Sequence, residues 1–382
     1  MRVALAHDYL TQRGGAERVV LSMRKAFPQA PVHTSLYRPD LTFPEFGSQE
    51  VHTSPLQRAG ALLDDHRRAL PLLAWTFGRL RVDADVVLCS SSGWAHGLRT
   101  SGRKIVYCYT PARWLYQTQR YLGDASAGVR ATLAVLAPAL RHWDHRAARS
   151  ADRYLTSSTA VQERIRELYG IESTLVPPPH TIDPKGPQEP VIDLAPGYVL
   201  CVARFRPYKN IDVVVSAFRS LVGERLVVVG EGPDRARLEA SAGPNVRFIG
   251  GVDDAQLRWL YAKCAGVVAA SYEDYGLTPL EGAAFAKPSA VLRWGGFLDT
   301  VQANRTGVFF DQPDAGSVAE AVKELLGRSW DDVHILAHAE RFNEQRFIDR
   351  LRSVVAEEAG ARTGSARRRS GESTSPPEAQ IG

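Results

Sequence analysis

The short apolar run Ala265–Ser271 and the acidic stretch after it, Glu273–Glu281, constrain the fold more than any other part of the chain. Because the run is short and bounded, it predicts a parallel strand that is buried on both faces. Pro279 is typical of the first position of a helix. We therefore expect Glu273 at the carboxyl end of a strand and Glu281 in the first turn of the next helix, where open α/β sheets bind ligands.

Two interpretations of Glu273–Glu281 stay open at this point. Thr278 and Glu281 have the spacing of a capping box, which would give Glu281 a structural role. Alternatively, a helix amino terminus binds an anion, and Gly276 lets the main chain approach a ligand closely. Glu273 favours the second interpretation, because a carboxylate that is buried without a partner costs free energy.

The chain of 382 residues is too long for one ordinary core and suits two domains. A proline-rich linker marks the boundary between them, and the last residues are too rich in Ser, Gly, Pro, Arg and Glu to bury a core. We predict a first domain over 1–183, a linker over 184–197, a second domain over 198–335, a terminal helix over 336–360 and a disordered tail over 361–382.

The charge is distributed unevenly between the two halves. Residues 1–190 carry 24 Lys and Arg against 17 Asp and Glu, whereas the remainder carries 23 against 25. This excess predicts that the first domain meets an anionic partner, either a membrane surface or a phosphorylated acceptor. A solvated surface rich in Arg explains the same excess, and no nucleic-acid motif is present.

Hydropathy and cysteine usage indicate the cellular compartment in which we expect the protein. No apolar run approaches the ~20 residues of a membrane-spanning helix, and the amino-terminal apolar run is too short for a signal peptide. The four cysteines form no C-x-x-C pair, so neither a zinc site nor a disulfide framework is indicated. We expect a cytoplasmic protein with buried, reduced thiols.

Two long helical stretches, Ser54–Val82 and Val129–Arg149, mix Leu, Ala and Trp with Arg and His. Basic amphipathic helices that contain Trp are typical of proteins at the surface of an anionic bilayer. An ordinary helix that faces the core explains the pattern as well. If membrane contact exists, we expect it to be peripheral, through the first domain and at the inner face of the plasma membrane.

Two further segments have the residue types that bind phosphate. A predicted strand at Met1–Leu10 leads to Gly14 and Gly15 before a helical pattern, which brings backbone N–H groups to a phosphate or sugar. Arg204 and Lys209 follow a second predicted strand. Two cations in such a loop fit a nucleotide diphosphate, because that leaving group gains negative charge as a glycosidic bond breaks.

Five blocks of the second half resemble, in the same order, those of retaining GT-B glycosyltransferases of family 4. The blocks are Val202–Asn210, Val228–Pro233, Asn245–Val252, Glu273–Glu281 and Gly295–Phe297, which together cover about residues 199–311. The resemblance implies an α/β GT-B fold: two Rossmann-like domains with parallel sheets facing a central cleft, and a last helix that crosses back to the first domain.

A shorter block, Tyr109–Tyr116, resembles a mannosyltransferase-like branch of the same family. In this chain, however, Tyr109 stands where those relatives usually have His, which weakens the case for acid–base chemistry there. Arg113, whose guanidinium is a fixed fork of donors suited to phosphate, remains a candidate. His96, Tyr109 and Arg113 are therefore predicted to contact the acceptor or the sugar.

The resemblance also implies roles for individual residues. Arg204 and Lys209 would bind the diphosphate, Glu273 would position the transferred sugar, and Glu281 would bind the ribose hydroxyls. The other predicted donor contacts are Gly14, Gly15, Gly251, Val252, Tyr275, Gly276, Leu277 and Thr278. No metal or cofactor is expected.

The implied activity is transfer of a hexose, first of all mannose from GDP-mannose, to a glycan or polyprenyl-linked acceptor in cell-envelope or polysaccharide synthesis. A UDP-sugar-dependent transferase, a non-catalytic nucleotide-sugar binding protein and a nucleotide-sugar epimerase of the same fold are the alternatives. A dehydrogenase is rejected, because Gly230 and Gly232 are followed by Arg235 where a dinucleotide fingerprint has its third glycine.

Overall fold

The computed structural model describes residues 1–58, 70–118, 127–180 and 182–370, and these fall into two compact units. The first unit contains Met1–Tyr107, Trp143–Tyr154 and the carboxyl-terminal segment from Ile348, and the second contains Cys108–His142 and Leu155–Phe347. The predicted domain bounds themselves stay a prediction.

The first sheet has seven strands in the order β3-β2-β1-β4-β5-β6-β7. Its strands are β1 (Val3–His7), β2 (Val32–Thr34), β3 (Val51–Thr53), β4 (Val86–Ser91), β5 (Arg103–Cys108), β6 (Arg153–Thr156) and β7 (Ser173–Leu175). β1 pairs in parallel with both β2 and β4, with Leu5 opposite Val32 on one side and Leu88 on the other. The direction of winding therefore reverses between β1 and β4.

The second sheet has six strands in the order β10-β9-β8-β11-β12-β13. Its strands are β8 (Val199–Val202), β9 (Leu226–Val229), β10 (Val246–Ile249), β11 (Gly266–Ala269), β12 (Ser289–Leu292) and β13 (Gly307–Phe310), and all of their pairings are parallel. Both sheets have the order of a Rossmann-like fold, which confirms the predicted fold class. In this sheet the winding reverses between β8 and β11.

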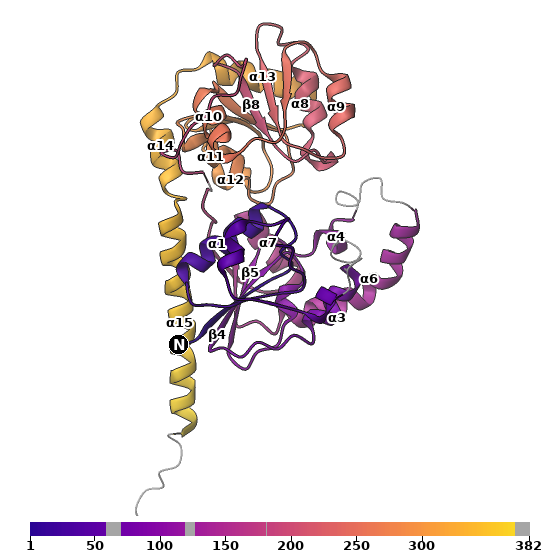
Figure 1. Cartoon of the computed structure of the whole chain (residues 1–382), viewed down its shortest axis with the longest axis vertical. Helices are drawn as coiled ribbons and strands as arrows, with labels where there is room; N and C mark the ends of the chain where they lie inside the picture. Colours follow the sequence, from indigo (N-terminus) through magenta and orange to yellow (C-terminus); the bar gives the residue numbers. More distant parts are fainter. Residues whose placement is uncertain (59–69, 119–126, 181, 371–382) are drawn as a thin grey trace, which may run out of the picture. The chain divides into compact units, whose positions relative to one another are not determined.

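Helices connect most consecutive strands of each sheet, as parallel pairing requires, and further helices follow the last strand, β13 (Figure 1). They are α1 (Gly15–Ala26), α3 (Leu70–Phe77), α4 (Arg113–Tyr116), α6 (Ala127–Ala148), α7 (Thr159–Tyr169), α8 (Ile211–Ala217), α9 (Arg235–Ser241), α10 (Asp254–Lys263), α11 (Leu277–Ala283), α12 (Phe297–Thr300), α13 (Ala315–Gly327), α14 (Asp332–Glu340) and α15 (Glu344–Ser370). Four short 3₁₀ helices, η1 (Pro44–Ser48), η2 (Pro55–Arg58), η4 (Ala95–Gly97) and η5 (Pro207–Lys209), complete the described elements.

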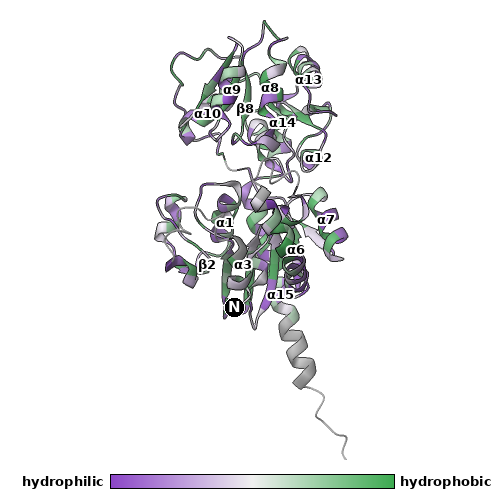
Figure 2. Cartoon of the chain, turned by 90° about the vertical axis from the view of Figure 1, so that its right-hand side faces the viewer, coloured by the Kyte–Doolittle hydropathy of each residue, from purple (hydrophilic) through white to green (hydrophobic). Residues whose placement is uncertain are grey.

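The second sheet is buried on both faces, as its continuous apolar strands predict. Along β9, Leu226 and Val228 join the core cluster under α8 and α13, whereas Val227 and Val229 join the opposite cluster under α10. Successive side chains of a strand point to opposite faces of the sheet, so one short strand contributes side chains to both cores. The strands are accordingly mostly hydrophobic in Figure 2, whereas the helices carry both colours.

One helix start differs from the sequence prediction, and the start of another is fixed by a side-chain cap. The helix after β11 begins at Leu277 rather than at Pro279, because Gly276 adopts a left-handed conformation (φ 86°) and ends the loop two residues earlier. The helix after β6 is capped by Ser158, whose side chain accepts the Val161 N–H, and Thr159 is its first residue.

The predicted terminal helix over 336–360 is two helices. α14 ends at Glu340, and α15 begins at Glu344 after Asn343, whose side chain accepts the Arg346 N–H in the manner of a helix cap. α15 also continues to Ser370, so the first ten residues of the predicted tail are helical. Ala and Arg favour helix, and no proline lies between Glu344 and Pro376 to interrupt it. Residues 371–382 lie outside the described chain.

Ion pairs attach α15 to the first unit. Arg103 lies 2.5 Å from Glu358 and 2.6 Å from Asp152, and Arg153 lies 2.6 Å from Glu357. Leu351 and Val354 on the same helix are fully buried. The amphipathic face of α15 therefore belongs to the core of this unit.

The predicted amphipathic stretches are described only in part. Ser54–Val82 contains η2 and α3, and its residues 59–69, including Leu62, Leu63, His66 and Arg67, lie outside the described ranges. α6 covers most of Val129–Arg149, as predicted. Among all helices whose residues are described, none combines the length and apolar character that crossing a bilayer requires. The four cysteines are buried and form no disulfide.

Candidate nucleotide-sugar site

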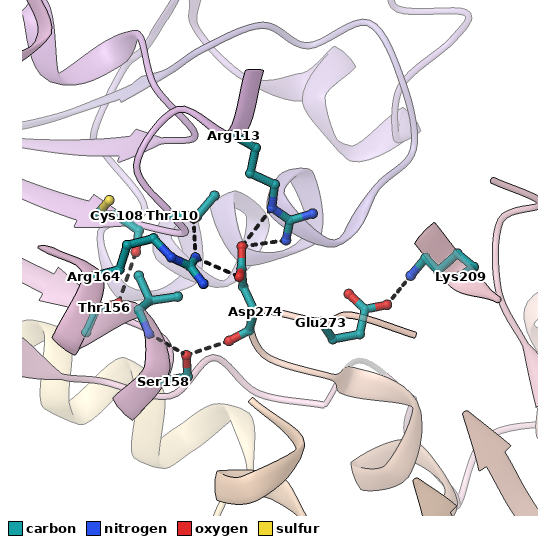
Figure 3. A network of polar contacts seen from close by, with 10 residues as sticks. Cys108, Thr110, Arg113, Thr156, Ser158, Arg164, Lys209, Glu273 and Asp274 are labelled. Carbon is teal, nitrogen blue, oxygen red and sulfur yellow. Dashed lines mark hydrogen bonds and ion pairs between the residues drawn. The ribbon is translucent and has the colours of Figure 1, made fainter. Parts of the chain in front are cut away.

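The reversal between β8 and β11 brings Lys209 and Glu273 together. β8 leads through Arg204 to η5, which ends at Lys209, and Glu273 lies on the loop that follows β11. The Lys209 Nζ donates to Glu273 Oε1, with the two side chains 14% and 20% exposed (Figure 3). Ligands of doubly wound sheets bind at such a reversal, beyond the carboxyl ends of the strands. Two of the predicted site residues thus meet where the topology favours a ligand.

Arg204 differs from Lys209 in its surroundings. It is exposed, and within the described part of the chain no carboxylate lies within ion-pair distance of it. Lys209 and Arg113 both lie near the ring of Tyr208, with the Lys209 Nζ 5.2 Å from the ring centroid. The loop after β8 therefore offers one cation held by Glu273 and one that faces solvent.

Asp274 lies at the centre of a buried ion-pair cluster (Figure 3). Its Oδ2 accepts from the Arg113 Nε at 2.7 Å and its Oδ1 accepts from the Arg164 Nη1 at 2.8 Å, while its side chain is 5% exposed. Arg164 also donates to the Thr110 hydroxyl at 2.8 Å. The two arginines come from α4 and α7, and each takes one oxygen of the same carboxylate.

The electrostatics of the cluster favour the ionised state of Asp274. Burial by itself raises the pKa of this carboxyl, but Arg113 and Arg164 outweigh it and hold the pKa below its usual value. Burial likewise lowers the pKa of the Arg113 guanidinium, and the Asp274 and Glu273 carboxylates more than reverse that effect. The cluster is therefore a charged one, with two guanidinium groups around one carboxylate.

The main chain around Asp274 is also fixed by hydrogen bonds. The Ser158 hydroxyl donates to the Asp274 carbonyl at 2.5 Å, and the same oxygen caps α7. The Tyr275 hydroxyl donates to the Pro178 carbonyl at 2.7 Å, and burial raises the pKa of that phenol well above its usual value. The loop that carries Glu273 is therefore held by side-chain and main-chain contacts together.

Glu281 has a structural partner that the sequence did not predict. It lies in the second turn of α11, and its Oε2 accepts from the Tyr261 hydroxyl at 2.7 Å. Burial and the nearby Glu281 carboxylate raise the pKa of Tyr261 well above its usual value, so the phenol stays a donor. Thr278 lies inside the helix and donates to the Val202 carbonyl at 3.4 Å, and the cap residue is Gly276. The predicted capping box is therefore not formed.

The remaining predicted donor contacts lie on two other loops. Gly251 follows β10 in a left-handed conformation (φ 65°) with open space around its Cα, and Val252 packs on the core under α10. Phe248 and Ile249, just before this loop, form the end of β10. In the first unit, Gly14 caps α1 and Gly15 is its first residue. The contacts of all these residues with a donor stay predictions.

The three candidates for sugar or acceptor contact are placed differently. His96 is 3% exposed, its Nδ1 lies 3.1 Å from the Ser91 hydroxyl, and its Nε2 lies 3.0 Å from Asp144 Oδ1 outside hydrogen-bonding angles. Arg113 pairs with Asp274. Tyr109 is half-buried at the end of β5. Both His96 and Arg113 thus contact protein carboxylates.

Sequence reasoning missed Asp274, Arg164 and Tyr261 as parts of this site. Asp274 and Arg164 are separated by 110 positions in the sequence, and nothing in the spacing of either pairs them. The one signal was a charged residue between a buried strand and a helix, which needs a partner if it is buried. Across the residues that the structure describes, no three His, Cys, Asp or Glu side chains converge as metal ligands.

We predict that Asp274→Ala lowers the free energy of unfolding by ~3–5 kcal/mol at neutral pH, because it leaves two guanidinium groups facing each other in a buried site. The folded-state pKa of Asp274 is lowered, so its contribution is present above the unfolded value of ~4 and is lost as the pH falls through the folded value. The difference between wild type and variant should therefore shrink below about pH 4.

Urea denaturation at several pH values measures this difference. Glu320→Ala removes an exposed partner of Lys323 on α13 and is the matched control, with an expected effect below about 1 kcal/mol. Equal destabilisation by the two variants would contradict the assignment of Asp274 as the anchor of a buried cluster.

Two family models match consecutive parts of the chain. "Glycosyltransferase Family 4" matches residues 13–184, and "Glycosyl transferases group 1" matches residues 184–345. The second match contains both cations and both glutamates of the candidate site.

Curated relatives agree with these matches. The chain is 28% identical over 221 residues to a glycogen synthase of Mycobacterium tuberculosis, which is 53% of this chain and 52% of the relative. This match therefore spans about half the length of the relative. A GDP-mannose-dependent alpha-mannosyltransferase of the same organism is 27% identical over 392 residues, covering 91% of this chain and 98% of the relative.

A solved structure extends the likeness to the fold. A protein of Anabaena, HepE, crystallised with UDP-glucose, matches with a TM-score of 0.69 and 15% identity over 94% of this chain and 100% of its own. At this identity the likeness concerns the fold alone. With the two family models, the parallel sheets and the mannosyltransferase relative, the chain belongs to the GT-B glycosyltransferases, in their mannosyltransferase-like branch.

Proposed function

We propose that this protein is a retaining glycosyltransferase that moves a hexose from a nucleotide sugar to a glycan or polyprenyl-linked acceptor. The observation that carries the proposal is the meeting of Lys209 and Glu273 at the reversal between β8 and β11, with Arg204 exposed on the same loop as Lys209. A cation and a carboxylate at that point suit the two parts into which a nucleotide sugar separates. The cation suits the diphosphate that leaves, and the carboxylate suits the sugar that is transferred. Membership of the family supports the same activity.

The first choice of donor is GDP-mannose. Support comes from the Tyr109–Tyr116 block and from the GDP-mannose-dependent relative that aligns along nearly the whole chain. A UDP-sugar is the second choice, since the structural likeness includes a protein crystallised with UDP-glucose. We propose synthesis of an envelope or secreted polysaccharide as the setting.

In the proposed reaction, the acceptor hydroxyl attacks the anomeric carbon as the bond to the diphosphate breaks. Arg204 and Lys209 stabilise the negative charge that develops on the diphosphate. A diphosphate oxygen takes the proton of the acceptor hydroxyl, so that attack and departure occur on one face and the anomeric configuration is retained. Glu273 and the backbone of Tyr275–Thr278 position the sugar.

The other donor contacts complete the proposed site. Glu281, oriented by Tyr261, binds the ribose hydroxyls. The main chain of Gly251 and Val252 contacts the base, and Gly14 and Gly15 contact the diphosphate. We propose that residues 198–335 hold the donor and residues 1–183 the acceptor.

Two alternatives share the fold and are separated by simple assays. A binding protein without catalysis would be stabilised by nucleotide sugars yet leave them intact. An epimerase would convert the donor without any added acceptor, whereas a transferase requires one.

We expect GDP-mannose, or else a UDP-sugar, to raise the melting temperature of the purified protein, because a ligand that binds only the folded state stabilises it by mass action. Radiolabelled sugar should then appear on methyl α-mannoside or on a polyprenyl diphosphate-linked glycan. Lys209→Ala should lower kcat by ~10²–10³-fold, and Lys323→Ala, an exposed position on α13, should leave it unchanged. Full activity of Lys209→Ala would reject the proposed role of the cation.

Glu281→Gln should weaken binding of GDP or UDP by about tenfold or more, because a hydrogen bond to a charged group contributes ~1.5–3 kcal/mol. Tyr261→Phe should weaken it less, since it removes only the group that orients the carboxylate. Isothermal titration calorimetry measures both. Unchanged affinity in Glu281→Gln would assign this residue to the support of α11 alone.

We also propose peripheral contact with an anionic membrane at the inner face of the plasma membrane. On α3, Leu72 and Trp75 are 44% and 55% exposed, and the Arg79 guanidinium lies 4.3 Å from the Trp75 ring. An apolar surface beside basic groups suits an interfacial helix.

Flotation with phosphatidylcholine vesicles, with and without phosphatidylglycerol, tests this contact. Binding should require the anionic lipid and weaken with salt. Trp75→Ala should reduce binding, whereas Val333→Ala, at an even more exposed position of α14, should not. Equal binding to neutral vesicles, or no binding at all, would count against it.

A further inference from the structure

Asp274, the buried neighbour of Glu273, has no role in the proposed reaction, although burying its charge costs free energy. Asp274 is 4% exposed, and a buried charge requires several partners to be tolerated. Both of its carboxylate oxygens and its carbonyl oxygen are occupied by donors: Arg113, Arg164 and Ser158. These three donors come from α4, α7 and the cap of α7 (Figure 3). A residue held in this way cannot rotate or shift without breaking charged contacts.

We propose that Asp274 is the positioning residue of the site, which fixes the main chain at the end of β11 so that the Glu273 carboxylate faces Lys209. The proposal rests on the proposed transferase function and deepens it. It also gives Arg113 a role through Asp274, and adds Arg164, a residue that no sequence pattern singled out.

Backbone contacts between the loop and Gly296 support this role. The Gly296 N–H donates to the Glu273 carbonyl at 3.0 Å, and a Cβ on Gly296 would lie 2.2 Å from the Tyr275 Cα. The loop is therefore held by Gly296 as well as by the contacts of Asp274. Because Asp274 directly follows Glu273 and shares a planar peptide unit with it, a shift of the Asp274 main chain also moves the main chain of Glu273.

The charge pattern supports it as well. Two guanidinium groups share the Asp274 carboxylate, which leaves the neighbouring Glu273 free to pair with Lys209 rather than with Arg113. An Asn at position 274 would keep the shape of the side chain but lose the charge that both arginines face. With Asp274 neutral, the Arg113 guanidinium becomes available to compete with Lys209 for the Glu273 carboxylate.

Asp274→Asn, Arg164→Lys and Arg164→Gln test the proposal in the full chain. We expect kcat to fall by about 10–100-fold in Asp274→Asn, because small displacements from a reactive geometry have such effects. Arg164→Gln should lose less activity, and Arg164→Lys should keep more of it because the charge remains. The affinity for GDP or UDP should stay within about threefold of wild type in all three, since no donor contact is removed.

A purely structural ion pair predicts a different result. Asp274→Asn would then melt at a lower temperature but keep the kcat of the wild type below that temperature, and this outcome would overturn the proposal. A parallel loss of nucleotide affinity would overturn it too, since it would make Asp274 part of the donor contacts. Because Asp274→Asn also removes a buried charge, the two Arg164 variants keep the test decisive if that variant fails to fold.

Amide hydrogen exchange separates this proposal from the proposed function. In the unliganded protein, peptides that cover residues 272–278 should exchange faster in Asp274→Asn than in wild type, while peptides of α13 should not. Glu320→Gln on α13 is the matched control and should change neither. A wild-type protein that transfers no sugar would reject the transferase function alone, whereas unchanged exchange at residues 272–278 would reject the positioning role.

Discussion

The reversal of winding beside β8 is the constraint on which the candidate site depends. A strand at the centre of a parallel sheet has neighbours on both sides, and the chain must cross over the sheet in opposite directions to supply them. No crossover helix therefore runs between the loop after β8 and the loop after β11. Lys209 and Glu273 meet in that position although 64 residues separate them in the sequence.

Burial of charge gives this edge of the sheet its rigidity. Apolar packing holds the strands themselves, since side chains of β9 alternate between two cores. Beyond β11, the ion pairs of Asp274 hold the loop that carries Glu273. Charged hydrogen bonds are directional, so they define an orientation that apolar contacts would leave looser. The same contacts make the region sensitive to protonation of one carboxylate.

The sequence predicted a central strand of the second sheet. The short apolar run Ala265–Ser271 indicated a buried parallel strand, and β11 occupies Gly266–Ala269 within that run. Errors occurred where one residue decides a boundary: Gly276 began α11 before Pro279, and Asn343 divided the terminal helix. Such local choices depend on backbone angles and on caps that periodicity does not encode.

What the sequence determined by itself was the class of fold and the chemical character of the candidate site, because strand periodicity and the family blocks both lie in contiguous segments. Arg204, Lys209, Glu273 and Glu281 could be identified in this way, each beside its own strand or helix. Only the tertiary structure decided which side chains pair with one another. Arg113 and Arg164 pair with Asp274, and Tyr261 pairs with Glu281. Each of these contacts joins distant segments, and their pairing is set by the packing of whole elements rather than by any local pattern.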